Sequence, residues 1–261
     1  MAKARLDDLL VQKGVAQDRK EALALVLSGR VLIGGQRAST AGERVDPAAE
    51  IRIKDAGLSY ASRGGLKLEG ALREFRLSVE GFVCADLGAS TGGFTDCLLQ
   101  HGARRVHAFD VGKGQLDWRL RQDPRIVIHD QFNVRYLKPE DVGERLDLIT
   151  LDLSFISLTK VLPALRPFAP ALIVALVKPQ FEAERGEVGP GGIIQSPELQ
   201  VEILERVKAF ALKEGFEILG ETPSPIAGQK GNREFLLLMR GKDPQDPRDL
   251  KDLKDNRDLR P

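Results

Sequence analysis

The sequence has few residues of the kinds that bind metals or form disulfides. Its 261 residues include two cysteines, Cys84 and Cys97, and three histidines, His101, His107 and His129. Both cysteines lie in regularly patterned apolar segments, so we expect reduced packing residues in a reducing compartment such as the cytoplasm. The histidines lack the spacing of metal ligands. We therefore expect neither a disulfide framework nor a metal site.

Long hydrophobic runs are also missing. No stretch approaches the roughly 18 to 20 apolar residues of a membrane-spanning helix. Residues 1–13 alternate charges with leucines, whereas a signal peptide needs an apolar run. We expect neither a membrane span nor secretion.

Charge of one sign is not in excess. The chain has 39 Lys and Arg against 38 Asp and Glu, a net charge of +1, so any nucleic-acid binding must rest on local clusters. Hydrophobic residues make up 42% and charged residues 30%, which is typical of a folded protein. The length favours two domains.

The N-terminal pattern predicts a small α+β domain over residues 1–57. It consists of two short amphipathic helices, Arg5–Gln12 and Arg19–Ser28, and short strands that include Val31–Ile33 and Ile51–Lys54. Asp18 precedes the second helix as a candidate N-cap, with Glu21 in the capping-box position. Three glycines nearby predict a linker over residues 58–65.

Residues 66–241 predict a larger α/β domain. Buried-type strands are expected at Phe82–Leu87, Arg105–Val111, Arg125–His129, Asp147–Leu153 and Ala171–Val177, followed by closing strands at Phe216–Gly220 and Arg233–Met239. Helices are expected at Thr91–His101, Gly114–Gln122, Leu158–Pro167 and Pro197–Gly215. This alternation is typical of a doubly wound parallel sheet. The glycine-rich loop Glu184–Gly192 is a candidate lid, and residues 242–261 predict a charged, disordered tail.

A glycine-rich segment between a predicted strand and helix is the candidate cofactor site. Asp86 opens this segment, which continues through Gly88, Ser90, Thr91, Gly92, Gly93 and Phe94. Glycines allow close approach of a ligand to the backbone, and a helix start offers free N–H groups. The acidic residue suits the ammonium of a methionine moiety better than a phosphate.

Three more aspartates end the following strands. They are Asp110, Asp130 and Asp152. Strand-end carboxylates gather at the ligand-binding edge of an open α/β sheet, where an acid such as Asp110 can hold ribose hydroxyls. Strand-end aspartates also commonly cap the next helix, which is the alternative for each of them alone.

Longer motifs in these segments resemble the TlyA family. The resemblance rests on Gly88–Thr95 (GASTGGFT), Asp110–Leu116 (DVGKGQL), Asp152–Ser157 (DLSFIS) and Val177–Glu182 (VKPQFE), within a likeness that runs from Lys3 to about Arg240. It implies S-adenosylmethionine-dependent 2′-O-methylation of cytidine in ribosomal RNA. It also implies an S4-like RNA-binding domain followed by a Rossmann-like class I methyltransferase domain of the FtsJ type, which binds the cofactor through Asp86, Gly88, Ser90, Thr91, Gly92, Gly93, Phe94, Asp110, Val111, Asp130 and Asp152.

The resemblance further implies a Lys-Asp-Lys-Glu tetrad at Lys67, Asp152, Lys178 and Glu234. A ribose hydroxyl is a poor nucleophile, so its attack on a sulfonium methyl needs a base. A lysine can serve when burial and a neighbouring cation lower its pKa. Taken alone, Lys178 fits a solvated strand-end lysine better than a catalytic one. Beside the other three residues of the tetrad, we assign Lys178 as the base, Lys67 as the cation and the two acids as orienting groups. Phe155 and Phe181 are either core residues or stacking surfaces.

Basic residues of the N-terminal domain are the candidate RNA contacts. They are Lys3, Arg5, Lys13, Arg19, Lys20, Arg30 and Arg37, joined by Arg63 beyond the linker. Neighbouring acids such as Asp7 and Asp8 dilute this charge, so a solvated helix face is the alternative. The S4 resemblance favours binding of structured ribosomal RNA or ribosomal subunits through phosphates.

Two other function classes remain to be weighed. A membrane-acting cytolysin is suggested by the historical hemolysin label of the family, but no helix has the wide apolar face and basic rim that membrane insertion needs. A noncatalytic ribosome-assembly factor would not need the tetrad. We therefore expect an enzyme that acts on RNA in the cytoplasm.

Overall fold

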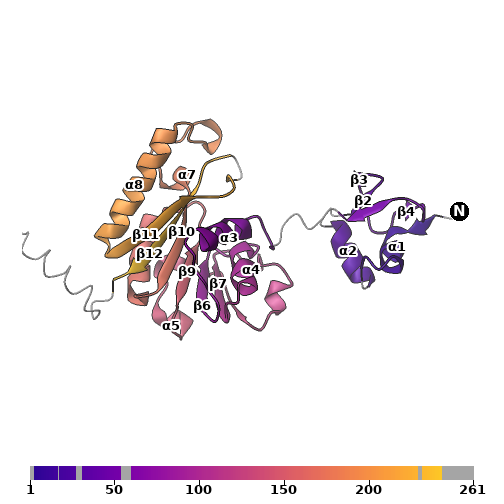
Figure 1. Cartoon of the computed structure of the whole chain (residues 1–261), viewed down its shortest axis with the longest axis horizontal. Helices are drawn as coiled ribbons and strands as arrows, with labels where there is room; N and C mark the ends of the chain where they lie inside the picture. Colours follow the sequence, from indigo (N-terminus) through magenta and orange to yellow (C-terminus); the bar gives the residue numbers. More distant parts are fainter. Residues whose placement is uncertain (1–2, 17, 28–30, 54–59, 229–230, 243–261) are drawn as a thin grey trace, which may run out of the picture. The chain divides into compact units, whose positions relative to one another are not determined.

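A computed structural model describes residues 3–16, 18–27, 31–53, 60–228 and 231–242. The chain divides into two compact units, residues 1–59 and 60–261 (Figure 1). Each unit has a hydrophobic core of its own. Within the described residues, no helix is both long enough and apolar enough to cross a membrane.

The N-terminal unit packs two helices on short strands. The helices are α1 (Leu6–Gln12) and α2 (Arg19–Leu27), and the strands are β1 (Ala4–Arg5), β2 (Val31–Ile33), β3 (Gln36–Arg37), β4 (Arg44–Val45) and β5 (Ile51–Ile53). The strands form a three-stranded sheet of order β3-β2-β5 and a β1-β4 ribbon. Leu6, Leu10 and Val31 are fully buried between helices and sheet. Asp18 Oδ1 accepts the backbone N–H of Glu21 at 2.8 Å, which confirms the predicted N-cap.

The second unit is built on a seven-stranded sheet of order β11-β12-β10-β9-β6-β7-β8. Its strands are β6 (Val83–Leu87), β7 (Arg105–Asp110), β8 (Ile126–Asp130), β9 (Leu148–Leu151), β10 (Leu172–Val177), β11 (Phe216–Pro223) and β12 (Phe235–Gly241). Five neighbouring strands run parallel to one another, in the sheet order β10-β9-β6-β7-β8. β12 runs antiparallel to both β10 and β11, so the two predicted closing strands complete a mixed sheet.

Alternating residues of the central strands bury opposite faces of this sheet. In β10, Ile173, Ala175 and Val177 belong to one core cluster. Val174 and Leu176 belong to the other. Helices α3 (Gly64–Glu74) and α4 (Gly93–Gln100) cover the second face, whereas α5 (Pro139–Val142), α6 (Leu162–Leu165) and α8 (Pro197–Lys213) cover the first (Figure 1). Burial on both faces explains the continuous apolar runs of these strands.

Two predicted helices are wrong in extent. Of residues 114–122, only the 3₁₀ turn η1 (Leu120–Gln122) is helical, because Gly114 adopts a positive φ of 67° and Asp117 turns the chain by accepting the N–H of Arg119. Residues 158–167 break into η3 (Leu158–Lys160), α6 and η4 (Arg166–Phe168). Pro163 and Pro167 lack the N–H groups that a continuous helix needs.

The sequence pattern missed helix α3. Gly64 and Gly65 suggested the end of a linker, yet they form the first turn of this helix. A Cβ at Gly65 would lie 2.2 Å from Cγ of Tyr60, so the glycine is needed for close packing. The helix therefore begins inside the predicted linker, and it carries Lys67. Residues 58 and 59 of that linker, residues 54–57 before it, and 243–261 of the predicted tail lie outside the described residues.

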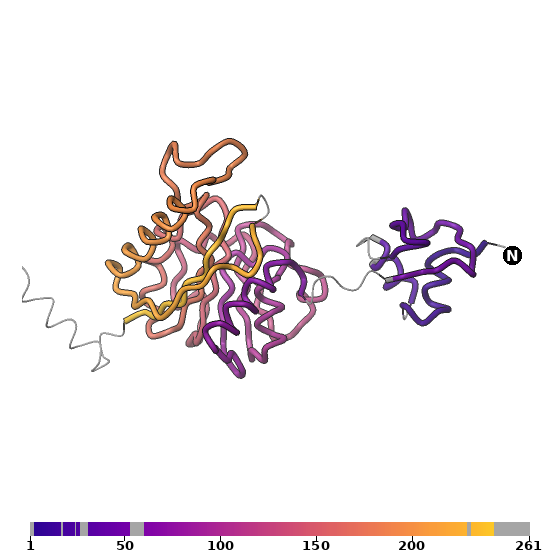
Figure 2. Tube along the Cα trace, turned by 45° about the horizontal axis from the view of Figure 1, so that its top comes forward, coloured from indigo at the N-terminus to yellow at the C-terminus, as the bar shows by residue number. Residues whose placement is uncertain are grey.

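The predicted lid loop, residues 184–192, projects from the domain between α7 (Pro179–Glu182) and α8 (Figure 2). Arg206 of α8 contacts both carboxylate oxygens of Glu187, at 2.9 and 2.8 Å. Asn232 donates to the carbonyl oxygen of Gly192 at 2.8 Å. These contacts, one before and one within the short turn η5 (Pro190–Gly192), tie the loop to the domain. The remaining 3₁₀ segment, η2 (Val134–Tyr136), follows β8.

Candidate active site at the carboxyl edge of the sheet

Parallel strands bring the predicted site residues to one edge of the sheet. β6 to β10 present their carboxyl ends together, and each is followed by a loop that carries polar residues. Asp110 and Asp130 lie directly opposite each other at the ends of β7 and β8. Asp152 and Lys178 immediately follow β9 and β10. Ligands bind at this edge in open α/β sheets.

The glycines of the loop after β6 serve the packing of the protein itself. A Cβ at Gly88 would lie 2.8 Å from the backbone oxygen of Asp152. At Gly92 it would lie 2.3 Å from Leu120, and at Gly93 it would lie 2.2 Å from Ser62. These glycines are therefore needed for packing, and the approach of a ligand to their backbone stays a prediction.

Only some residues of the glycine-rich motif in that loop are exposed. Phe94 is 2% exposed and belongs to the core, whereas Ser90 and Thr91 are exposed. Ser90 adopts a positive φ of 49° and donates its backbone N–H to Asp110 Oδ2 at 2.9 Å. Ser90 and Thr91 are thus the loop side chains that can meet a ligand.

Asp86 is placed differently from the sequence-based prediction. Its carboxylate is fully buried and accepts the hydroxyl protons of Thr95 at 2.7 Å and Thr150 at 3.0 Å. Burial raises the pKa of Asp86 to about 6. A carboxylate enclosed in this way anchors the loop from beneath and does not face the open edge, so the structure does not place Asp86 as the predicted direct ligand contact.

Asp110 and Asp130 remain accessible. Asp110 accepts backbone N–H groups from Ser90 and Gly112 on its two oxygens, which fixes the carboxylate and leaves lone pairs on both atoms. Asp130 accepts the N–H of Gly114 at 3.1 Å and pairs with Arg121 at 3.3 Å. Val111 is 70% exposed beside them and offers an apolar surface. Together these residues can hold a group with hydroxyls and an apolar ring.

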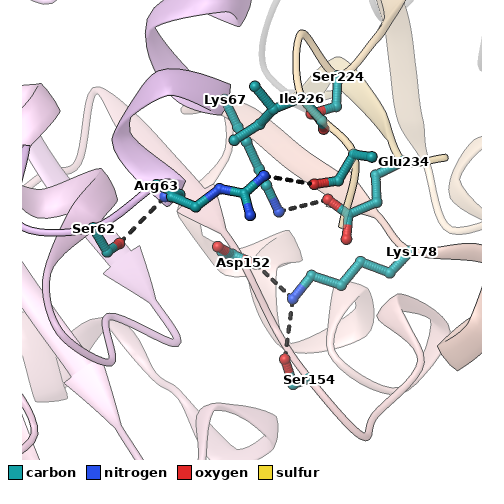
Figure 3. Close-up of polar contacts among 11 residues, drawn as sticks. Ser62, Arg63, Lys67, Asp152, Ser154, Lys178, Ser224, Ile226 and Glu234 are labelled. Atoms are coloured by element: carbon teal, nitrogen blue, oxygen red, sulfur yellow. Dashed lines mark hydrogen bonds and ion pairs between the residues drawn. The ribbon is translucent and has the colours of Figure 1, made fainter. Parts of the chain in front are cut away.

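Two lysine–carboxylate pairs lie side by side at the same edge (Figure 3). Lys67 of α3 contacts Glu234 at 2.5 Å, and their side chains are 11% and 3% exposed. Lys178 Nζ lies 2.6 Å from Asp152 Oδ1, with side chains 10% and 22% exposed. The charge of Lys67, the predicted neighbouring cation, is therefore balanced by Glu234.

Lys178 has a second partner that the sequence did not suggest. Its ammonium donates a hydrogen bond to Ser154 Oγ at 3.0 Å. The contact with Asp152 has the distance of an ion pair, but Asp152 Oδ1 lacks a hydrogen bond of proper geometry. Asp152 thus attracts the Lys178 ammonium by its charge, and Ser154 makes the directional hydrogen bond to it.

An aromatic pair borders these groups. Phe155 is 91% exposed and has a positive φ of 64°, a conformation that costs a residue with a side chain about 1–3 kcal/mol. Its ring lies 5.1 Å from that of Phe181, and Lys178 Nζ lies 5.7 Å from the Phe181 ring. A large apolar ring held in water beside the lysine rules out the core alternative for Phe155.

The predicted basic residues of the N-terminal unit are exposed, but two are neutralised. Arg5 pairs with Asp7 at 2.6 Å, and Arg19 pairs with Asp8 at 2.5 Å. Lys3, Lys13, Lys20 and Arg37 are exposed, and Arg30 lies outside the described residues. Arg63, exposed in the second unit, donates to the carbonyl oxygen of Ala227 at 3.4 Å.

Two of the three histidines, His107 and His129, contact each other inside the domain, whereas His101 is exposed. His107 lies 2.9 Å from Glu144 and 3.2 Å from His129, and His101 lies 2.9 Å from the carbonyl oxygen of Cys97. Across the described parts of the chain, no group of three or more His, Cys, Asp or Glu residues could hold a metal ion. Cys84 and Cys97 are free and buried.

Comparisons with known proteins place both units in families. Residues 60–241 match the FtsJ-like methyltransferase family, and residues 4–51 match the S4 domain. The chain is 46% identical over 241 residues to the 16S/23S rRNA (cytidine-2′-O)-methyltransferase TlyA of Mycobacterium tuberculosis, covering 91% of this chain and 90% of that protein.

Two relatives carry hemolysin names. Hemolysin A of Brachyspira hyodysenteriae is 41% identical over 235 residues, which are 89% of this chain and 98% of that protein. A solved structure from Streptococcus thermophilus, also named a hemolysin, has a TM-score of 0.71 at 42% identity and covers 99% of both chains. The same likeness thus extends across relatives with either name.

Proposed function

The chain belongs to the TlyA family of S4-containing, FtsJ-like methyltransferases, and from this premise we propose that it methylates the ribose 2′-hydroxyl of a cytidine in ribosomal RNA. The observation that carries the proposal is the pairing of Lys178 with Asp152 beside Lys67 and Glu234. Two nearly buried lysines at a ligand-binding edge suit proton removal from a hydroxyl better than they suit a folding role.

S-adenosylmethionine is the proposed methyl donor. When bound, it supplies an electrophilic methyl group and leaves as a neutral thioether. Asp110 retains acceptor capacity for ribose hydroxyls, and exposed Val111 offers an apolar surface for adenine. Asp130, Ser90, Thr91 and Asp152 border the same edge, and Asp86 supports the loop from beneath.

Lys178 is the proposed proton acceptor. In its amine form it takes the proton of the 2′-hydroxyl as the oxygen bonds to the methyl carbon. The ammonium formed then faces Asp152 at the ion-pair distance of 2.6 Å, which stabilises the new charge. The Lys67–Glu234 pair positions the ribose from the side of α3.

Phe155 and Phe181 are the proposed surface for the target nucleotide. An exposed ring beside the proton acceptor can stack on a base that has left its own stack. In the same proposal, the exposed Lys3, Lys13, Lys20, Arg37 and Arg63 contact RNA phosphates, and the enzyme works in the cytoplasm, where ribosomes are assembled.

The experiment is methyl transfer from labelled S-adenosylmethionine to ribosomal subunits, followed by digestion of the RNA to nucleosides. Wild-type protein should give labelled 2′-O-methylcytidine, and Lys178→Ala should give only background. Label on a base, or equal label with both proteins, would refute the proposal. A noncatalytic assembly factor would bind subunits and transfer nothing.

A further inference from the structure

Two segments of the active site, the loop of residues 152–158 and the segment formed by Lys178 and helix α7, contact each other at three successive points. At one end, Lys178 Nζ contacts Asp152 and Ser154. In the middle, the Phe155 and Phe181 rings lie 5.1 Å apart. These contacts fix the position of the loop relative to the lysine.

Glu182 closes the other end. Its Oε2 accepts the hydroxyl proton of Ser157 at 2.6 Å, and its Oε1 accepts the backbone N–H of Leu158 at 2.9 Å. The same short helix that begins after Lys178 therefore ends on a clamp that grips the loop. The clamp lies just beyond Phe155, whose positive φ of 64° is a conformation that surrounding contacts must hold.

Resting on the proposed function, we propose that Ser154 is a positioning residue that aims the Lys178 amine at the substrate hydroxyl, and that the Glu182 clamp holds Ser154 in place. A lysine side chain has four rotatable bonds and no preferred direction at its end. Asp152 attracts the Lys178 ammonium but makes no properly oriented hydrogen bond to it. The hydrogen bond to Ser154 is the directional contact.

Ser154 can do this without supporting the fold. The residue is exposed, so removing its hydroxyl opens no buried cavity. Loss of the hydroxyl leaves Lys178 paired with Asp152 but free to swing. A displacement on the order of 1 Å can slow a reaction about a hundredfold.

The test is single-turnover methyl transfer to ribosomal subunits at saturating cofactor and subunit. Ser154→Ala should lower the rate roughly tenfold to a hundredfold, with unchanged dissociation constants for cofactor and subunit. Ser154→Thr, which keeps a hydroxyl, should retain most of the rate. Ser78→Ala, at an exposed serine in the turn before β6, is the matched control and should match wild type.

The clamp is tested by a double-mutant cycle. Glu182→Ala removes the acceptors of both the Leu158 N–H and the Ser157 hydroxyl and should slow transfer in the same way. Because both changes act on the aim of Lys178, the double variant should be no slower than Ser154→Ala alone.

An unchanged rate in Ser154→Ala would overturn the role of Ser154. A double variant whose rate loss is the product of the two single losses would overturn the link to Glu182. In both cases the wild-type protein still transfers methyl groups, so the proposed function stands. Wild-type protein that transfers no methyl group would instead refute the proposed function itself.

Discussion

Substitutions in the Lys67–Glu234 pair can distinguish its contribution to stability from its contribution to catalysis. Glu234 is 3% exposed and Lys67 11%, so removing one partner leaves the other as an uncompensated charge in a nearly buried place. Breaking such a pair costs about 3–5 kcal/mol. Each kcal/mol lowers the melting temperature of a domain of this size by about 2–4 °C. Lys67→Met should therefore melt roughly 6–20 °C below wild type.

Replacing both partners should recover most of that loss. An apolar pair of similar volume leaves no unpaired charge, and such replacements are often neutral or stabilising. Lys67→Met with Glu234→Leu should therefore melt well above Lys67→Met alone, by calorimetry without ligands. Methyl transfer should stay at background in both variants, because ribose positioning needs the charges.

Two results would refute this reasoning. A double variant that regains both melting temperature and methyl transfer would show that the pair only supports the fold. A single variant that melts with wild type would show that the charge is not buried in solution.

Three further predictions concern the cofactor, the RNA and pH. Asp110→Ala should weaken S-adenosylmethionine binding by about 1–3 kcal/mol in calorimetry, because a ribose hydroxyl loses its acceptor, and unchanged affinity would exclude Asp110 as a contact. A chain starting at Tyr60, the first residue of the second compact unit, should bind cofactor normally but bind subunits more weakly and with a shallower salt dependence; equal slopes would give the N-terminal unit another purpose. Burial, and then the neighbouring His107, lower the pKa of His129 from 6.5, so its neutral form stabilises the fold above that pH and the contribution is lost as pH falls through the lowered value. His129→Phe keeps the stacking on Phe109 and should flatten the fall of the melting temperature below pH 6.5 relative to wild type, whereas parallel curves would exclude His129.

The strands and their edge were predictable from sequence, and the reasons are local. Continuous apolar runs such as Leu172–Val177 report burial on both faces, which only a covered central strand experiences. Because these strands are parallel, the acids that end them lie at the same edge of the sheet. Lys178 and Asp152 meet because β9 and β10 are neighbours.

Other features depended on tertiary contacts that no local pattern encodes. The Gly64–Gly65 pair suggested a break, but Tyr60 packs where a side chain would project, and the helix that carries Lys67 starts there. Asp86 matched a ligand-binding position in spacing, yet hydroxyls of Thr95 and Thr150 from α4 and β9 enclose it.

Ser154 and Glu182 show the same limit at the site. Both lie inside motifs that the sequence analysis quoted, but their roles come from hydrogen bonds across 24 or 25 residues of chain. A serine or glutamate in a loop carries no signal of such a partner. The charges at the site were therefore predictable, whereas the groups that orient them were not.

The central claim is that Lys178 takes the proton of the ribose hydroxyl. Its most direct test is the single-turnover rate of methyl transfer to ribosomal subunits by Lys178→Ala and Lys178→Arg, with cofactor and subunit binding measured for each. We predict near-normal binding and a rate lowered by roughly 10² to 10⁴ in both variants, because a guanidinium keeps the positive charge but cannot release its proton near neutral pH. An arginine variant that retains most of the wild-type rate would contradict the claim.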